Sequence, residues 1–231
     1  MIRGIAFDLE GTVVNVEEAH HKGHLCAARD VGVVMDLDTA LQKIPHFIGG
    51  PDKEIAKEIW ELSDRTKSVD FIRERDRYYY EQFLKNMTIM PRPGFLEVFQ
   101  WLKQNDFQMA IGSLTPSRQA KVLLEKSGLC NLFAPGRIVL AENVTEVKPH
   151  PEVYFATAAR MGINPSEQLV FEDSPRGVEA ARKAGSRAVG MPVYTRRETI
   201  EALMTAGASR YFSDWNLHDI AELIESLNRA Y

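Results

Sequence analysis

The sequence predicts an α/β protein whose core is a doubly wound parallel sheet (Rossmann-like), with an all-helical domain inserted near its start. The main observation is that strand-like and helix-like segments alternate, with short connections, over residues 91–231. A short apolar run at residues 5–7 also suits a buried strand. Residues 15–88 instead show helical periodicity and no convincing strand. We therefore expect residues 1–14 and 89–231 to form the core and residues 15–88 the insertion.

Composition and charge argue against several classes of protein. Of the 231 residues, 45% are hydrophobic and 26% are charged, which is ordinary for a packed globular chain. The net charge of -4 gives no support for a nucleic-acid-binding surface. No apolar run approaches the roughly 20 residues of a membrane-spanning helix, and no signal peptide precedes the first strand. We therefore expect a cytoplasmic protein that binds neither nucleic acid nor membranes.

Glycine, proline and capping residues divide the insertion into helices. Gly32 follows the first periodic segment as a helix-terminating glycine, Pro45 breaks the second, and Asp52 suits the N-cap of the third. The expected helices of the insertion cover residues 19–31, 37–44, 53–64 and 69–85.

The same signals divide the core. Pro175 suits the first turn of a helix, and Gly128 and Gly185 follow the ends of two others. The expected helices cover residues 95–104, 117–127, 151–161, 175–184 and 217–227. The expected strands after the first cover residues 107–111, 138–140, 169–171, 187–190 and, as a weak signal, 211–212.

Two carboxylates follow the first strand. A buried strand that ends at Asp8 places this side chain at the carboxyl end of the sheet, where open α/β sheets bind ligands. Gly11 allows a sharp turn, so Glu10 could face the same opening. One such carboxylate can act as a nucleophile while the other transfers protons. Taken alone, the two residues could equally be solvated acids in a turn.

Three further sites lie at the ends of strands or before helices. Ser113 can bind a phosphate oxygen beside a helix start, Lys148 can face an anion, and the pair Glu172 and Asp173 can hold Mg²⁺. Individually they could be a helix cap, a surface lysine and a charged loop. Together with Asp8 they match phosphoryl transfer to an aspartate.

These residues resemble the motifs of the haloacid dehalogenase superfamily, in particular its phosphatase and β-phosphoglucomutase-like branch with a helical cap. The resemblance covers essentially the whole chain. Its four motifs stand at residues 7–12, 111–113, 147–149 and 170–174, and the last continues with Gly177, Ala180, Ala181, Ala184 and Gly185.

The resemblance implies a role for each site residue. Asp8 would be the nucleophile that forms an aspartyl-phosphate, and Ser113 and Lys148 would bind the phosphate. Mg²⁺ would be held by the Asp8 carboxylate, the Glu10 backbone carbonyl and Asp173, and we count Glu172 in the same metal site.

One position departs from the usual motif, because the second acid is commonly aspartate and here it is Glu10. Glutamate keeps the acid–base chemistry but adds a methylene, and the enolase-phosphatase branch is similar in carrying glutamate there. The cap is expected to select the substrate through His20 and the loop that contains Gly49. Of the neighbouring residues, His21 and His24 are expected to be exposed.

The expected function is therefore Mg²⁺-dependent hydrolysis of a small phosphorylated metabolite through an aspartyl-phosphate. A sugar phosphomutase of the β-phosphoglucomutase type shares these motifs. A relative that binds a phosphorylated ligand with weak catalysis is a third possibility, because of Glu10. We expect a monomer or a homodimer.

Overall fold

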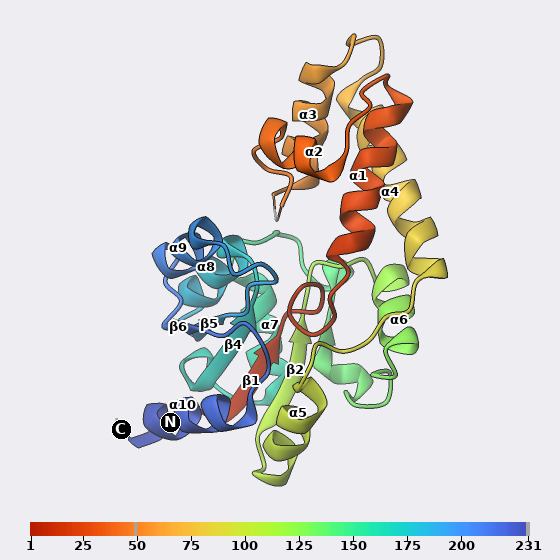
Figure 1. Ribbon diagram of the computed structural model, residues 1–231. Helices are drawn as coiled ribbons and strands as arrows, with labels where there is room; N and C mark the ends of the chain where they lie inside the picture. The colour runs from red at the N-terminus through yellow and green to blue at the C-terminus, as the bar shows by residue number, and fades with distance from the viewer. Residues whose placement is uncertain (49, 230–231) are drawn as a thin grey trace. The chain divides into compact units, whose positions relative to one another are not determined.

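The computed structural model describes residues 1–48 and 50–229 (Figure 1). The chain divides into two units, one comprising Met1–Asn15 and Ile89–Tyr231 and the other Val16–Thr88. These are named here the core unit and the helical unit. The junctions expected from the sequence follow residues 14 and 88.

The core unit is built on a parallel sheet with the strand order β3-β2-β1-β4-β5-β6. Its strands are β1 (Gly4–Phe7), β2 (Gln108–Gly112), β3 (Ile138–Val139), β4 (Gln168–Glu172), β5 (Arg187–Gly190) and β6 (Arg210–Tyr211). Figure 1 shows β1 between β2 and β4. The chain therefore winds outward in one direction from β1 to β3 and in the other from β4 to β6, which confirms the predicted doubly wound fold.

Helices and short turns connect the strands of the core unit. The helices are α5 (Phe95–Gln104), α6 (Ser117–Lys126), α7 (Glu152–Met161), α8 (Pro175–Lys183), α9 (Arg197–Thr205) and α10 (Leu217–Arg229). Short 3-10 turns occur at Pro135–Arg137, Ala141–Asn143 and Pro165–Glu167. Helix α9, in which Leu203 is the buried residue, was not predicted from the sequence.

The two faces of the central strands differ in side-chain size. On one face, Ala6 pairs with Ala110 and Val170, and these small residues pack with buried residues of α7, α8 and α9. On the other face, the Phe7 ring contacts aromatic rings that include those of Phe171 and Trp215. Successive side chains of a strand point to opposite faces, so the sheet is buried on both sides and its functional edge is the strand ends.

A buried arginine fixes the loops at the carboxyl edge of the sheet. Arg92 Nη1 donates hydrogen bonds to Gly11 O and Met191 O, both at 2.7 Å, and Nη2 donates to Pro192 O at 3.3 Å and to Ser213 O. Arg92 therefore joins the turn after β1 to the loop after β5.

The helical unit contains α1 (Glu17–Asp30), α2 (Leu37–Lys43), α3 (Asp52–Leu62) and α4 (Val69–Asn86). Its apolar core joins buried residues of all four helices, such as Ala28, Ala40, Ile59 and Ile72. Gly23 of α1 faces α4, where an added Cβ would lie 2.8 Å from Asp76 Oδ1. Within the described residues, no helix is both long and apolar enough to cross a membrane.

Candidate active site

Asp8 follows the central strand directly. Its backbone N–H donates to Phe171 O at 3.0 Å, which extends the pairing of β1 with β4 by one residue. The chain then turns at Gly11, whose φ is +78°, and a Cβ at this position would lie 2.0 Å from Asp173 Oδ2. Glycine is therefore required both by the turn and by the close approach of Asp173.

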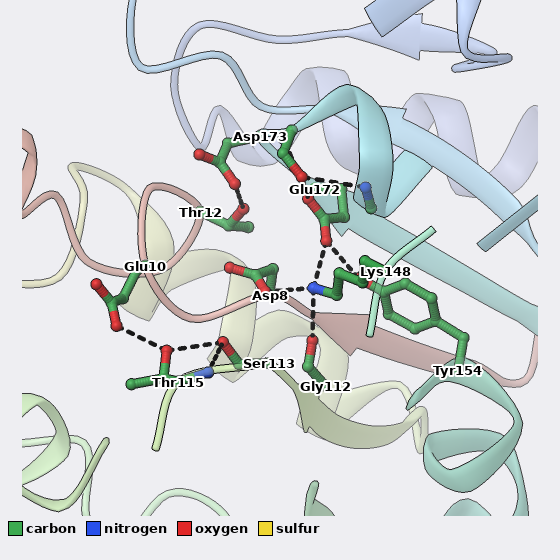
Figure 2. A network of polar contacts seen from close by, with 12 residues as sticks. Asp8, Glu10, Thr12, Gly112, Ser113, Thr115, Lys148, Tyr154, Glu172 and Asp173 are labelled. Atoms are coloured by element: carbon green, nitrogen blue, oxygen red, sulfur yellow. Dashed lines mark hydrogen bonds and ion pairs between the residues drawn. The ribbon is translucent and has the colours of Figure 1, made fainter. Parts of the chain in front are cut away.

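Lys148 lies at the centre of the polar network in Figure 2. Its Nζ donates to Asp8 Oδ1 at 2.6 Å, to Glu172 Oε1 at 2.5 Å and to Gly112 O at 3.2 Å. These bonds use the three protons of the ammonium group. The backbone carbonyl of Lys148 accepts from Arg176 Nε at 3.0 Å and Nη2 at 2.5 Å, so the main chain is fixed as well.

The charges of this network are strongly coupled. Burial raises the pKa of the Asp8 carboxyl to about 7, and the charge of Lys148 opposes that rise. Burial alone would lower the pKa of Lys148, but the Asp8 and Glu172 carboxylates more than offset this effect, so its pKa is raised. Lys148 therefore carries a permanent positive charge beside the candidate nucleophile.

The surroundings of Glu172, which was expected to be a metal ligand, favour a role beside Lys148. Glu172 is fully buried, and its Oε1 accepts from Lys148 and from the Tyr154 hydroxyl at 2.7 Å. Its Oε2 accepts from the backbone N–H and hydroxyl of Ser174, at 3.1 and 3.0 Å. Because protein donors occupy both oxygens, the side chain positions Lys148 instead.

Tyr154 was not anticipated as a member of the site. The Lys148 Nζ lies 5.2 Å from the centroid of its ring, and its hydroxyl donates to Glu172. Burial and the nearby carboxylates raise the pKa of Tyr154, so the phenol stays protonated and remains a donor. The sequence feature that could have identified Tyr154 is a tyrosine on the apolar face of the helix that follows Lys148.

We expect Tyr154→Phe to lower the free energy of unfolding by about 1–2 kcal/mol, because a buried charged acceptor loses one donor. Urea denaturation measures this loss. Tyr78→Phe is the matched control, because Tyr78 is half exposed, and its stability should be unchanged. Equal stabilities of the two variants would show that the Tyr154 hydroxyl contributes nothing to the network.

Asp8 and Asp173 are the carboxylates that could bind a metal ion. Asp173 follows β4, and its Oδ1 accepts from Thr12 Oγ1 at 3.4 Å. In the described part of the chain, no group of three or more His, Cys, Asp or Glu side chains is arranged to bind a metal. Carboxylate oxygens are nevertheless the hard ligands that Mg²⁺ prefers, and backbone carbonyl, water and phosphate oxygens would complete such a set.

Glu10 and Ser113 form a second polar group near Asp8 and are connected through Thr115 (Figure 2). The Thr115 hydroxyl donates to Glu10 Oε1 at 2.7 Å and lies 3.0 Å from Ser113 Oγ. The structure thus brings Asp8, Glu10, Ser113 and Lys148 together in the core unit. Thr115 was not predicted as a site residue, because its position two residues after Ser113 carried no distinctive signal.

The histidines of the helical unit differ from the expectation in their burial. His21 and His24 are 6% and 3% exposed, so the expectation that they are exposed is wrong. His24 Nδ1 lies 2.9 Å from Asp76 Oδ1, and His21 Nε2 lies 3.5 Å from Glu17 Oε2. An acidic side chain therefore lies beside each of the two buried imidazoles.

His20 is only partly buried, and its ring stacks on that of Tyr80 with 4.0 Å between the centroids. Tyr80 therefore fixes the orientation of the imidazole that was expected to contact substrate. Gly49, the other expected cap residue, lies outside the described residues.

Comparison with known proteins gives consistent matches along the chain. A family model described as haloacid dehalogenase-like hydrolase matches residues 5–191. A phosphorylated carbohydrates phosphatase of Thermotoga maritima is 27% identical, with 90% of this chain and 92% of that protein covered. The fructose-1-phosphate phosphatase YqaB of Escherichia coli is 32% identical, with 80% of this chain and 94% of that protein covered.

The fold also matches solved structures. The crystal structure of β-phosphoglucomutase from Clostridium difficile superposes with a TM-score of 0.74 at 22% identity. The superposition covers 100% of this chain and 99% of that one. At this identity, the match is evidence for the fold alone.

Proposed function

Because this chain belongs to the haloacid dehalogenase-like hydrolase family, we propose that it hydrolyses small phosphorylated metabolites by transferring the phosphoryl group to Asp8. Membership of the family and the named phosphatase relatives confirm the expectation of an enzyme of this phosphatase branch. The nucleophile, the acid–base residue and the metal requirement are parts of the proposal.

The contact between Lys148 and Asp8 is the observation that carries the proposal. The ammonium lies 2.6 Å from Asp8 Oδ1 and also donates to Glu172, which in turn accepts from the Tyr154 hydroxyl. A phosphate ester and a carboxylate repel each other, so a fixed cation between them lowers the cost of their approach. A buried lysine that served only the fold would not need to contact the residue at the carboxyl end of the central strand.

The remaining steps use Ser113 and Glu10. The Ser113 hydroxyl donates to a phosphate oxygen and orients the phosphorus toward Asp8. Asp8 attacks, the bond from phosphorus to the ester oxygen breaks, and protonated Glu10 gives its proton to the leaving alcohol. Glu10 then removes a proton from the water that cleaves the aspartyl-phosphate.

The Asp8 and Asp173 carboxylates, with the Glu10 carbonyl, would hold Mg²⁺. When bound, Mg²⁺ supplies positive charge to the phosphate oxygens. Glu172 has no direct part in this set, because it acts on Lys148.

Phosphorylated sugars are the proposed substrate class, in line with the names of the two phosphatase relatives. We propose that the helical unit acts as a cap and that His20, held by Tyr80, contributes to the choice of substrate. A cytoplasmic location and a monomeric or homodimeric state remain predictions.

A panel of phosphate esters with Mg²⁺ tests the function. We expect hydrolysis of sugar phosphates, with a loss of at least about 10²-fold when a chelator removes the metal, because metal charge stabilises phosphoryl transfer by several kcal/mol. Undiminished turnover in the chelator would contradict the metal requirement. If no ester were hydrolysed but phosphorylated ligands raised the unfolding temperature, the chain would be a binding relative.

The same assay separates hydrolysis from phosphomutase activity. A hexose 1-phosphate is supplied together with its bisphosphate, and the products are followed by NMR. The proposal predicts release of inorganic phosphate. Isomerisation without release would assign the chain to the mutases.

A further inference from the structure

The Thr115 side chain connects Glu10 and Ser113, two of the predicted site residues (Figure 2). Its hydroxyl donates to Glu10 Oε1 at 2.7 Å, and Ser113 Oγ lies 3.0 Å from the same hydroxyl oxygen. The sequence motifs and the family resemblance gave Thr115 no role. The distance of 2.7 Å between the two oxygens is that of a well-formed O–H···O hydrogen bond.

The backbone around Thr115 is constrained, so its hydroxyl has a defined position. Pro116 follows, which restricts Thr115 to extended conformations. The Thr115 N–H donates to Ser113 Oγ at 3.4 Å, and its carbonyl accepts from the Ala141 N–H at 3.4 Å. The residue is 6% exposed, and its branched side chain has few rotamers.

Glu10 requires such an anchor because its side chain has one more rotatable bond than an aspartate. A carboxyl group that samples several rotamers spends little time within reach of a leaving-group oxygen. A misplacement of about 1 Å can cost on the order of 10²-fold in rate. The Thr115 hydroxyl belongs to the core unit, as Glu10 does, so this contact does not depend on the helical unit.

Given the phosphoryl transfer proposed above, we propose that Thr115 is the positioning residue that fixes the Glu10 carboxyl for proton transfer to the leaving group. Thr115 acts through Glu10 and does not itself contact the phosphate. Its contribution should therefore depend on how much the leaving group needs a proton. Alkyl esters need general acid help, whereas an aryl ester with a nitrophenolate leaving group needs little.

Thr115→Val tests this role, because valine keeps the branched shape and removes the hydroxyl. We expect kcat/KM for an alkyl phosphate to fall about 10- to 100-fold, within the range of general acid catalysis, and that for the nitrophenyl ester to change less than about 3-fold. Thr115→Ser, which keeps the hydroxyl, should retain most of the wild-type kcat/KM for the alkyl phosphate. Thr205→Val is the matched control on the exposed end of α9 and should change neither rate.

A double-mutant cycle with Glu10→Gln makes the test specific. If Thr115 acts through Glu10, the valine substitution should cost little further activity toward the alkyl ester when glutamine is already present. Equal losses for alkyl and aryl esters, or fully additive effects, would overturn the proposal and make Thr115 a phosphate ligand or a structural residue. Thermal unfolding of each variant identifies a loss caused by misfolding.

These outcomes are separate from a failure of the proposed function. Wild-type turnover of the nitrophenyl ester reports whether the chain is a phosphatase at all. The ratio of alkyl to aryl rates reports the role of Thr115 alone. A wild-type enzyme that hydrolyses the aryl ester, combined with an unchanged ratio in Thr115→Val, would refute the positioning role and leave the phosphatase proposal intact.

Discussion

Asp8→Asn is expected to reduce phosphatase turnover by at least about 10⁴-fold, because the amide is nearly isosteric with the carboxylate but is not a nucleophile. Steady-state rates with a nitrophenyl ester and Mg²⁺ measure the loss. The fold should survive, because Lys148 keeps its bonds to Glu172 and to Gly112 O. Turnover within about 10-fold of wild type would exclude Asp8 as the nucleophile.

The same variant should alter the pH dependence of stability in the absence of metal. Burial raises the pKa of Asp8 from 3.8 to about 7, so between these values the folded protein binds more protons than the unfolded chain. The contribution of Asp8 to stability is therefore lost as the pH rises from about 4 to about 7. The unfolding temperature of wild type should fall relative to that of Asp8→Asn across this range, and a constant difference would contradict the shift.

Lys148→Met should have the second largest effect, on activity and stability together. The substitution leaves the Asp8 and Glu172 carboxylates buried without the cation that both contact. Breaking a buried ion pair in this way costs about 3–5 kcal/mol in unfolding free energy, and loss of the fixed charge should lower turnover about 10³-fold. Stability is measured by urea denaturation and turnover by the ester assay.

Acidification should partly restore the stability of Lys148→Met, because protonation of one carboxyl group relieves the repulsion. Lys121→Met is the control, since Lys121 is exposed and lies 3.8 Å from Glu125 in a surface pair. It should stay within about 0.5 kcal/mol of wild type. If the two variants were equally stable, Lys148 would not be the centre of a tightly paired buried network.

Much of the core fold could be predicted from the sequence because its strands are short apolar runs bounded by glycine, proline and carboxylates. The order of these runs placed Asp8, Ser113 and Lys148 near one edge of the sheet. The edge helix α9 was missed because its pattern is weak, and Leu203 is its buried residue.

The partners within the site could not be predicted, because they depend on contacts between loops that are distant in the sequence. Glu172 and Asp173 are adjacent, yet one faces Lys148 and Tyr154 while the other contacts Thr12. A pair of acids in a sequence does not reveal this division. The burial of His21 was unpredictable for a similar reason, since a helix of low apolar content gave no sign of it.

Chemical trapping of the phosphorylated residue tests the central claim most directly. Hydroxylamine converts an acyl phosphate into a hydroxamate, which peptide mass spectrometry can locate. The proposed mechanism predicts modification of Asp8 that requires substrate and Mg²⁺ and is absent from Asp8→Asn. Continued turnover in hydroxylamine with Asp8 unmodified, or a hydroxamate on another residue, would contradict the mechanism.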